Sequence, residues 1–137
     1  MVNFDKKKDI MRYRFGTGTK WEEQVGYSRV IRHGNQVEVA GTVAVDSDGN
    51  LVGVDDMYAQ AVFILNKIER ALHEGGASLK DVIRTRSFVT DISRWEEFAR
   101  AHSEFFDSVR PVATLVEVSK LIDPRMLIEI EVSAIIM

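Results

Sequence analysis

The C-terminal stretch, residues 110–136, contains two runs in which apolar and polar positions alternate. In the second run the even-numbered positions 128–136 are apolar, whereas Glu129, Glu131 and Ser133 lie between them. Successive side chains of a strand point to opposite faces, so this run predicts a half-buried strand with one polar face. The first run, residues 112–118, predicts a second strand of the same kind.

A turn is predicted between these two strands at residues 122–125, because Pro124 fixes φ and cannot donate to a strand ladder. Glu117 and Glu129 lie in the middle of the two strands. A carboxylate in that position needs water, a partner or a ligand. The pattern therefore leaves two interpretations open for each glutamate, a solvated polar face or a contact to a bound molecule.

Upstream periodicity predicts the remaining elements. A Gly-Asn pair at positions 34–35 between two β-rich runs is typical of a two-residue hairpin turn. Apolar residues at three- and four-residue spacing predict a helix that begins after Asp55 or Asp56 and ends at residues 73–76, where two glycines stand. In order, we expect strands at 11–15, 28–33, 36–42 and 51–54, a helix from 55–56 to 73, a strand at 82–90 and a helix at 93–107.

The strand at 82–90 and the second helix both show distinct faces. In the strand, Arg84, Arg86 and Phe88 share one side. In the helix, Ser93 and Glu96 have the spacing of a capping box. The predicted inner stripe of this helix consists of Trp95, Phe98, His102, Phe105 and Phe106.

This order of elements predicts an α+β sandwich, with two helices on one face of a mixed, mostly antiparallel sheet. The other sheet face is predicted to be open and to carry Phe88, Ala113 and Leu115 beside charged residues. We expect self-association to cover it, because assembly of identical chains is the common way to bury such a face.

Length and composition indicate one domain over residues 1–137, in which residues 1–10 are expected to form a flexible tail. The net charge of −3 gives no electrostatic reason to expect nucleic acid or an anionic membrane as partner. The chain has no cysteine and no apolar segment of membrane-spanning length. A cytoplasmic location is the expectation that fits these features.

No motif in the sequence commits the chain to a chemistry by itself. The glycines of residues 16–20 do not have Walker spacing, so a loop is favoured over a phosphate site. Residues 46–50 lack the ligands of a calcium loop and are interpreted as an Asp-Gly turn. The histidines are scattered, and His102 is interpreted as a core residue. No metal or cofactor is predicted.

Several segments, taken in order, resemble one known family. They are G-Y-S at 26–28, V-E-V-A-G-T at 37–42, G-G-A-S-L-K-D-V-I-R-T-R-S-F-V-T-D-I at 75–92, R-P-V-A-T-L-V-E-V at 110–118 and I-E-I-E-V-S-A at 128–134. Together they resemble the Rid family (RidA/YjgF) of reactive-intermediate deaminases, from about residue 13 to the C-terminus. The resemblance implies a chorismate-mutase-like fold and a homotrimer whose three sheets form a central barrel, with ligand clefts between subunits.

The resemblance also implies an activity and a site. Family members hydrolyse enamine and imine intermediates to 2-keto acids and ammonia. In active members an arginine after the Pro-Ala of the strand at 112–117 binds the substrate carboxylate, and that position is Ala113 here. Ala40 and Ala99 replace the family's small polar residue and asparagine. The positions retained are Tyr27 as a cleft aromatic, Gly41 as a backbone donor and Glu129 as the residue that holds water.

Loss of the arginine makes the chain similar to an arginine-less Rid subgroup. Arg84, Arg86 or Arg110 is a candidate to supply a guanidinium from another direction, and Thr114 and Glu117 are assigned to the cleft beside Ala113. The alternative is that these arginines pair with Glu117, Glu129 or Glu131 inside the trimer.

Two functional hypotheses follow from the sequence. The first is a hydrolase acting on a small imine, enamine or related carboxylate-bearing metabolite, with Glu129 orienting water. The second is a non-catalytic, metabolite-binding or regulatory trimer that kept the cleft and lost the chemistry. The usual 2-imino acid deaminase activity is in doubt under both hypotheses because Ala113 replaces the arginine.

Overall fold

The computed structural model describes residues 2–7 and 10–137, and the side chains of residues 11–137. The described elements, in chain order, are β1 (Val2–Lys7), β2 (Ile10–Phe15), α1 (Lys20–Val25), β3 (Val30–His33), β4 (Gln36–Thr42), α2 (Met57–Glu74), the 3-10 turn η1 (Leu79–Asp81), β5 (Val82–Val89), the 3-10 turn η2 (Ile92–Arg94), α3 (Trp95–Phe106), β6 (Val112–Glu117) and β7 (Ile128–Ile135).

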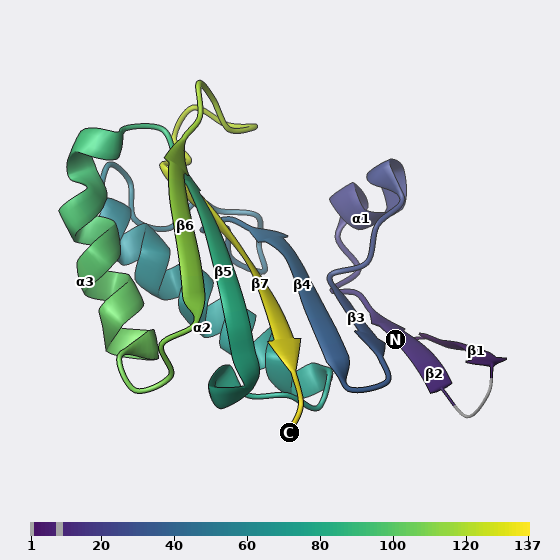
Figure 1. The fold of residues 1–137 in the computed structure, drawn as a ribbon. Helices are drawn as coiled ribbons and strands as arrows, with labels where there is room; N and C mark the ends of the chain where they lie inside the picture. Colours follow the sequence, from purple (N-terminus) through teal and green to yellow (C-terminus); the bar gives the residue numbers. More distant parts are fainter. Residues whose placement is uncertain (1, 8–9) are drawn as a thin grey trace.

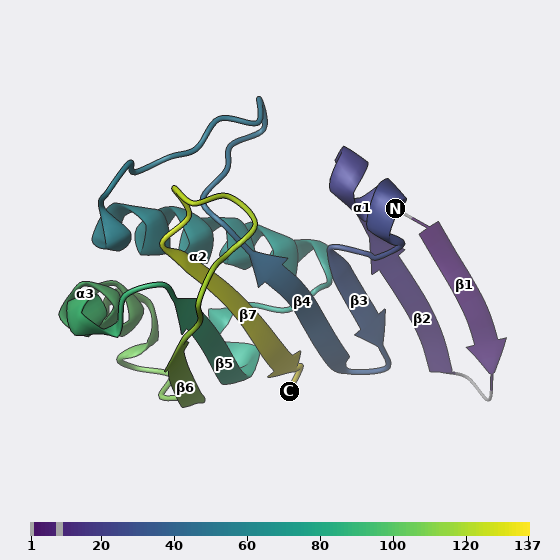
Figure 2. The ribbon, with the colours of Figure 1, turned by 90° about the horizontal axis from the view of Figure 1, so that it is seen from above.

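The described strands form one sheet of order β1-β2-β3-β4-β7-β5-β6, and α2 and α3 lie together on one of its faces (Figures 1 and 2). All neighbouring strands are antiparallel except β5 and β6, which are parallel. This arrangement confirms the predicted α+β sandwich. The short helix α1 lies near β2 and β3, away from the other two helices.

The core lies between α2 and the central strands. The helix begins at the predicted cap, where the Asp56 side chain accepts a hydrogen bond from the Ala59 amide at 2.9 Å. Its inner face buries Ile64, Leu65, Ile68 and Leu72 completely. Each such side chain contributes about 1.5–3 kcal/mol of burial free energy, which fixes α2 against β4 and β7.

A buried glutamine ties the helix to the segment that leads into β7. Gln60 is fully buried, and its Nε2 donates to the carbonyls of Gly53 and Arg125 at 3.0 Å each. Its Oε1 accepts from the Leu127 amide at 2.9 Å. These bonds satisfy the whole side-chain amide and hold the start of β7 in place, one residue ahead of Ile128.

The strand register confirms the predicted hairpin of β3 and β4, in which Val30 lies opposite Val39 and Gly34 has φ of 61°. The β4–β7 pairing shifts between Val39 and Thr42, which marks a β-bulge at residues 40–41. The turn predicted at residues 46–50 is also confirmed, because the Asp46 carboxylate accepts from the Asp48 and Asn50 amides at 2.9 Å.

Three local predictions differ from the structure, and one short helix was not predicted. Helix α1 follows the loop expected at residues 16–20, and Gly26, the residue after the helix, has φ of 83°. The predicted strand 51–54 is reduced to a single bridge at Leu51, since no further strand pairs with it. Asp91 caps the turn before α3 in place of a Ser93 capping box. Trp95, predicted to face inward, is 50% exposed.

The predicted open face also needs correction. Parallel pairing sets Thr85 opposite Ala113 and Ser87 opposite Leu115, so Ala113 and Leu115 lie on the side of the sheet that carries the helices. The β6 residues that lie on the open face are instead Val112, Thr114 and Val116, which pair with Arg84, Arg86 and Phe88 in turn. The expectation that Phe88 lies on this face agrees with the structure.

Part of the predicted tail has defined backbone structure. Residues 2–7 and 10 belong to the β1–β2 hairpin at the edge of the sheet, while residues 1, 8 and 9 lie outside the described part. The flexibility of this segment and the single-domain boundaries stay predictions.

His102 is half-buried and packs between aromatic side chains of the stripe predicted for α3. Its Nε2 is 2.9 Å from Thr85 Oγ1, and its ring lies between those of Phe98 and Phe106. Burial lowers the pKa of His102 from its ordinary value of 6.5. The folded protein therefore resists a protonation that the unfolded chain accepts.

We predict that the free energy of unfolding falls as the pH is lowered below 6.5, the ordinary histidine pKa. Above that pH, His102 is neutral in both states and the stabilisation is complete. His102→Gln keeps a polar partner for Thr85 and does not titrate, so its stability should change less between pH 7.5 and 5. Urea unfolding at a series of pH values checks this. If the free energy of unfolding changed equally with pH in wild type and His102→Gln, the prediction would be contradicted.

Candidate functional site

The bulge in β4 lies next to the residues that precede β3. The Ala40 amide donates to the Arg29 carbonyl at 3.0 Å, which continues the β3–β4 ladder up to the bulge. Past this bond the β4 backbone no longer matches its neighbour, and its carbonyl groups need other donors.

The Arg29 guanidinium and the Thr42 hydroxyl supply those donors, and Thr42 Oγ1 donates to the Ala40 carbonyl at 2.8 Å. Arg29 Nη1 lies 2.8 Å from the Gly41 carbonyl, 3.0 Å from Thr42 Oγ1 and 3.3 Å from the Ala40 carbonyl. Its Nη2 donates to the Tyr27 hydroxyl at 3.1 Å, and the guanidinium carbon lies 5.5 Å from the centre of that ring. Arg29 therefore fixes both the bulge and the aromatic residue predicted for the site.

Gly41 lies beneath the carboxyl group of Glu129, which comes from the neighbouring strand β7. A Cβ atom at position 41 would lie 3.0 Å from Glu129 Cδ and closer still to Oε2. Gly41 is not among the described glycines with positive φ, so it is needed here for space and not for an unusual backbone conformation. The bulge thus leaves room for a carboxyl group directly over the backbone.

Burial raises the pKa of Glu129 above its ordinary value, and the negative charge of Glu131 raises it further, while Arg29 opposes both effects. Among the residues that the structure describes, no cation lies within 4.0 Å of Glu129. A half-buried carboxyl group with a raised pKa and no ion pair is suited to accept and return a proton.

Two more ionisable groups lie near Arg29. Burial opposes ionisation of Glu22, but hydrogen bonds from Thr17 and Thr19, together with Arg29, leave its pKa below the ordinary value. The Lys67 ammonium group donates to the Val45 carbonyl at 3.0 Å. Burial lowers the pKa of Lys67, and the positive charges of Arg29 and Arg70 lower it further. The Arg29 region thus combines two cations with a carboxylate that is already hydrogen-bonded.

The other predicted site residues lie elsewhere in the protomer. Ala113 and Thr114 are exposed on edge strand β6, which β5 and β7 separate from β4. Glu117 accepts a hydrogen bond from the Ile92 amide at 3.0 Å and so supports the turn before α3. The structure therefore brings Tyr27, Gly41 and Glu129 together and leaves the β6 residues at the far edge of the sheet.

None of the three arginines predicted as substitutes reaches this group. Arg84 and Arg86 lie on the open face of β5, opposite Ser133 and Glu131. Arg110 pairs with Asp107 at 2.9 Å, outside the sheet. Within the described part of one chain, neither Arg84 nor Arg86 has a carboxylate within 4.0 Å, so the pairing expected inside a trimer stays a prediction.

Arg29 is the residue that the sequence interpretation missed. It begins the predicted hairpin in the segment Ser28-Arg29-Val30, where it reads as an ordinary exposed position of a strand. The sequence carried one signal for it. Because Val30 is an apolar strand position that faces the core, Arg29 beside it faces the opposite side of the sheet. From there its side chain can reach the carbonyls that the bulge leaves without donors.

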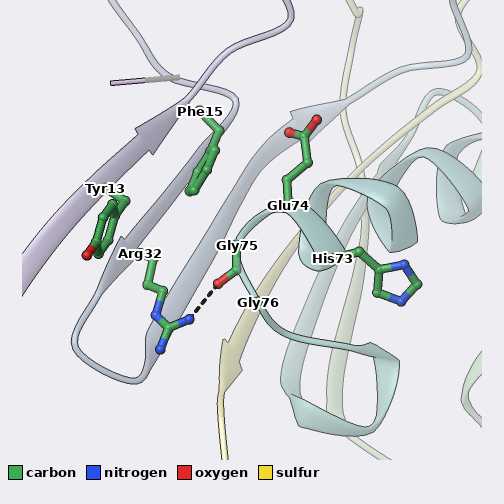
Figure 3. Close-up of a pocket in the computed structure, with 7 residues that line it drawn as sticks. All are labelled: Tyr13, Phe15, Arg32, His73, Glu74, Gly75 and Gly76. Atoms are coloured by element: carbon green, nitrogen blue, oxygen red, sulfur yellow. Dashed lines mark hydrogen bonds between the residues drawn. The ribbon is translucent and has the colours of Figure 1, made fainter. Parts of the chain in front are cut away.

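A shallow pocket of about 300 Å³ lies away from this group, between β2 and the C-terminus of α2 (Figure 3). It is lined by Tyr13, Phe15, Arg32, His73, Glu74, Gly75 and Gly76. Arg32 Nη1 donates to the Gly75 carbonyl at 3.1 Å, which satisfies a helix-end acceptor. Capping of α2 thus accounts for the position of Arg32 in this pocket. No residue predicted for the site lines the pocket.

Comparisons with known proteins agree with this arrangement. Residues 18–136 match the family model described as Endoribonuclease L-PSP. An uncharacterized protein of Streptomyces coelicolor is 40% identical over 121 residues, which cover 88% of this chain and 90% of the relative. The 3-aminoacrylate deaminase RutC of Acinetobacter baylyi is 33% identical over 104 residues, 76% of this chain and 82% of that protein.

The crystal structure of Rv2704 from Mycobacterium tuberculosis, described as a member of the YjgF/YER057c/UK114 family, superposes with a TM-score of 0.83. It is 45% identical, and the match covers 91% of this chain and 99% of that one. The chain belongs to the YjgF/RutC/Rid family. The resemblance inferred from the sequence is confirmed, as is the fold that it implied.

Membership of the YjgF/RutC/Rid family does not by itself assign roles to the residues of this site. The roles predicted for Glu129, Tyr27 and Gly41, and the equivalence of Ala113 to the family arginine, stay predictions. In the described part of the chain, no three His, Asp or Glu residues are grouped to hold a metal. No described helix has the length and apolar character needed to cross a membrane.

We predict that Gly41→Ala displaces the Glu129 carboxyl group, because the new Cβ occupies its space. The displaced atoms form the end of a flexible side chain, so the free energy of unfolding should fall by only about 1 kcal/mol. Turnover of a substrate that depends on Glu129 should fall on the order of 100-fold. Thermal unfolding and steady-state kinetics measure the two effects. Unchanged kinetics would show that the position of the carboxyl group is unimportant.

We further predict that Glu129→Gln stabilises the protein at pH 7.5. The pKa of Glu129 is raised in the folded state, so its ionisation destabilises the fold as the pH rises through that pKa. The amide removes this penalty. The advantage of the variant should shrink as the pH falls towards 4.5, the ordinary value, where wild-type Glu129 is protonated when folded. Melting temperatures at pH 4.5 and 7.5 test this, and a variant less stable than wild type at pH 7.5 would contradict it.

Proposed function

We propose that this protein hydrolyses a small imine or enamine metabolite and releases ammonia at the site formed by Tyr27, Arg29, Gly41 and Glu129. One observation carries the proposal: the carboxyl group of Glu129 lies half-buried over the Gly41 backbone, with a raised pKa. The deaminase name of the RutC relative supports the same class of reaction.

The reaction needs little from the protein because an imine carbon is already electrophilic. A 2-imino acid and one water give a 2-keto acid and one ammonia. In the proposed mechanism the Glu129 carboxylate accepts a proton from water as the oxygen forms its bond to the imine carbon. The protonated carboxyl group then returns that proton to the nitrogen, which gives a tetrahedral carbinolamine. The hydroxyl proton of the carbinolamine passes to the nitrogen in the same way as the carbon–nitrogen bond breaks, which leaves the keto acid and ammonia. A carboxyl pKa raised towards neutrality suits both steps.

We infer that the second wall of the site comes from another copy of the chain, in a homotrimer. Tyr27 and Gly41 lie on the β3–β4 side of the sheet, whereas the predicted cleft residues Ala113 and Thr114 lie on the opposite edge strand. Packing the edge of one sheet against the open face of another would join these halves. The exposed Val112 and Val116 on β6 support such an interface.

We expect light scattering in dilute buffer to give three times the chain mass of 15.5 kDa. Thr114→Arg places a bulky charge on the proposed interface strand and should shift the protein towards monomers, because a charge buried without a partner is costly. Arg70→Glu, on the exposed side of α2, is the control and should leave the mass unchanged. A monomeric wild-type protein would exclude the two-wall site.

A non-catalytic metabolite-binding trimer is the second candidate. The observation that favours it is Ala113, which stands where the family resemblance implies a substrate-binding arginine. Ribonuclease action, which the family description mentions, is not proposed, because a net charge of −3 does not favour a nucleic-acid surface.

Ammonia release from freshly generated 2-iminobutyrate or 2-iminopropionate distinguishes the two candidates. We expect the wild-type protein to accelerate release, and Glu129→Gln to reduce the acceleration on the order of 100-fold. Glu96→Gln is the matched control, because it changes an exposed carboxylate on α3. Saturable ligand binding without acceleration of any imine would instead support the non-catalytic trimer.

A further inference from the structure

A ligand with a negative charge needs a cationic partner in the site. We infer that the guanidinium of Arg29 binds an anionic group of the ligand, most simply a carboxylate, through the edge formed by its Nε and Nη2 atoms. The inference rests on the proposed function in that it places the ligand in the same site, but it can be tested on binding alone.

The present partners of Arg29 carry no negative charge. Every hydrogen-bond acceptor that the structure gives Arg29 is neutral: the Ala40 and Gly41 carbonyls, the Thr42 hydroxyl and the Tyr27 hydroxyl. Within the described residues, no carboxylate approaches the guanidinium within 4.0 Å. A partly buried cation with only neutral partners favours an anion, since charge-assisted bonds are about twice as strong as neutral ones.

Arg29 also has N–H donors that these partners do not use. A guanidinium has five N–H groups in one plane. The contacts at the bulge all go to Nη1, and Nη2 has a single acceptor. Nε–H has no acceptor in the described part of the chain. The Nε–Nη2 edge is therefore the one with spare donors, and two parallel N–H groups match the two oxygens of a carboxylate.

Two charged residues near Arg29, Glu22 and Lys67, bind to other groups. The Glu22 carboxylate is held by Thr17 and Thr19, so it is not free to turn towards Arg29. Lys67 adds a second positive charge, and the acceptor that the described residues give it is also a carbonyl, that of Val45. Glu22 and Glu129 interact with Arg29 only from beyond 4.0 Å, so within the described part of the chain an anionic ligand would be the first negative group in direct contact with the guanidinium.

Arg29 lies close to Glu129, because both side chains approach Gly41. Arg29 bonds the carbonyl of Gly41, and the carboxyl group of Glu129 covers the α-carbon of the same residue. A ligand carboxylate on Arg29 would therefore lie near the group proposed to move the proton. This matches a 2-imino acid, in which the carboxylate and the reacting carbon are directly bonded. It also explains how the site can work with Ala113.

The experiment compares two ligands of the same shape, 2-oxobutyrate and its neutral amide, by isothermal titration calorimetry. We expect 2-oxobutyrate to bind wild type and to bind Arg29→Gln about 10- to 100-fold more weakly. The amide should bind both proteins alike. Arg29→Lys keeps the positive charge but lacks the planar pair of N–H donors, so its affinity for 2-oxobutyrate should lie between those of wild type and Arg29→Gln. Arg100→Gln, which removes an exposed arginine of α3, should match wild type.

A second measurement needs no variant. The side-chain Nε–H resonance of Arg29 in ¹⁵N-labelled wild-type protein should shift on addition of 2-oxobutyrate and not of the amide. If Arg29→Gln unfolds, this measurement still decides the matter. Equal binding of 2-oxobutyrate by wild type and Arg29→Gln, or an unmoved Nε–H resonance at saturation, would overturn the inference.

The outcomes for the two proposals can be told apart. Arg29-dependent carboxylate binding without ammonia release supports the anion site and excludes the proposed hydrolase. Ammonia release whose KM is unaffected by Arg29→Gln supports the hydrolase and excludes Arg29 as the anion-binding residue.

Discussion

The contacts of Arg29 with the β4 bulge are the interaction on which the site depends. A bulge breaks the ladder between β4 and β7 and leaves carbonyl groups that no strand partner can satisfy. Unsatisfied carbonyls of this kind cost about 1–3 kcal/mol each when buried. One guanidinium satisfies two of them and the Thr42 hydroxyl, and also holds the Tyr27 hydroxyl. These contacts of Arg29, together with the space that Gly41 leaves for Glu129, fix the position of the site.

The bulge has a second consequence, for Glu129. In a regular ladder, the residue opposite Glu129 would carry a Cβ, and the carboxyl group would be directed away from the backbone towards solvent. Glycine at position 41 allows the carboxyl group to fold down over the strand, where burial and the neighbouring charge of Glu131 raise its pKa. Burial of the Glu129 carboxyl group lowers the stability of the fold, and the large buried core between α2 and the central strands offsets this loss. A trade-off of this kind, in which a chemically useful group lowers the stability of the fold, is common at functional sites.

Much of this fold follows from the sequence because periodicity reports burial. The alternation around Glu129, the hairpin at Gly34 and the cap at Asp56 all reflect local rules, and each is found in the structure. The placement of Ala113 and Leu115 was wrong because strand alternation gives two faces but does not say which one the helices cover; parallel pairing with β5 decides that. Arg29 was missed for a similar reason. Its importance comes from a register shift between β4 and β7, two strands far apart in the sequence, and no local pattern reports that shift.

The position of Arg29 bears on how a chain with Ala113 can still hold an anion. An arginine on β6 would lie on the edge strand, two strands away from β7 within one sheet, and would reach Glu129 only across a subunit boundary. Arg29 lies beside β4, next to Glu129, and is fixed before any ligand arrives. A fixed donor loses less conformational entropy on binding than a free surface arginine, so it gives more affinity for the same hydrogen bonds. The anion and the proton-transfer group would then belong to one chain. The neighbouring subunit would be needed to close the site and exclude water, and not to supply its charge.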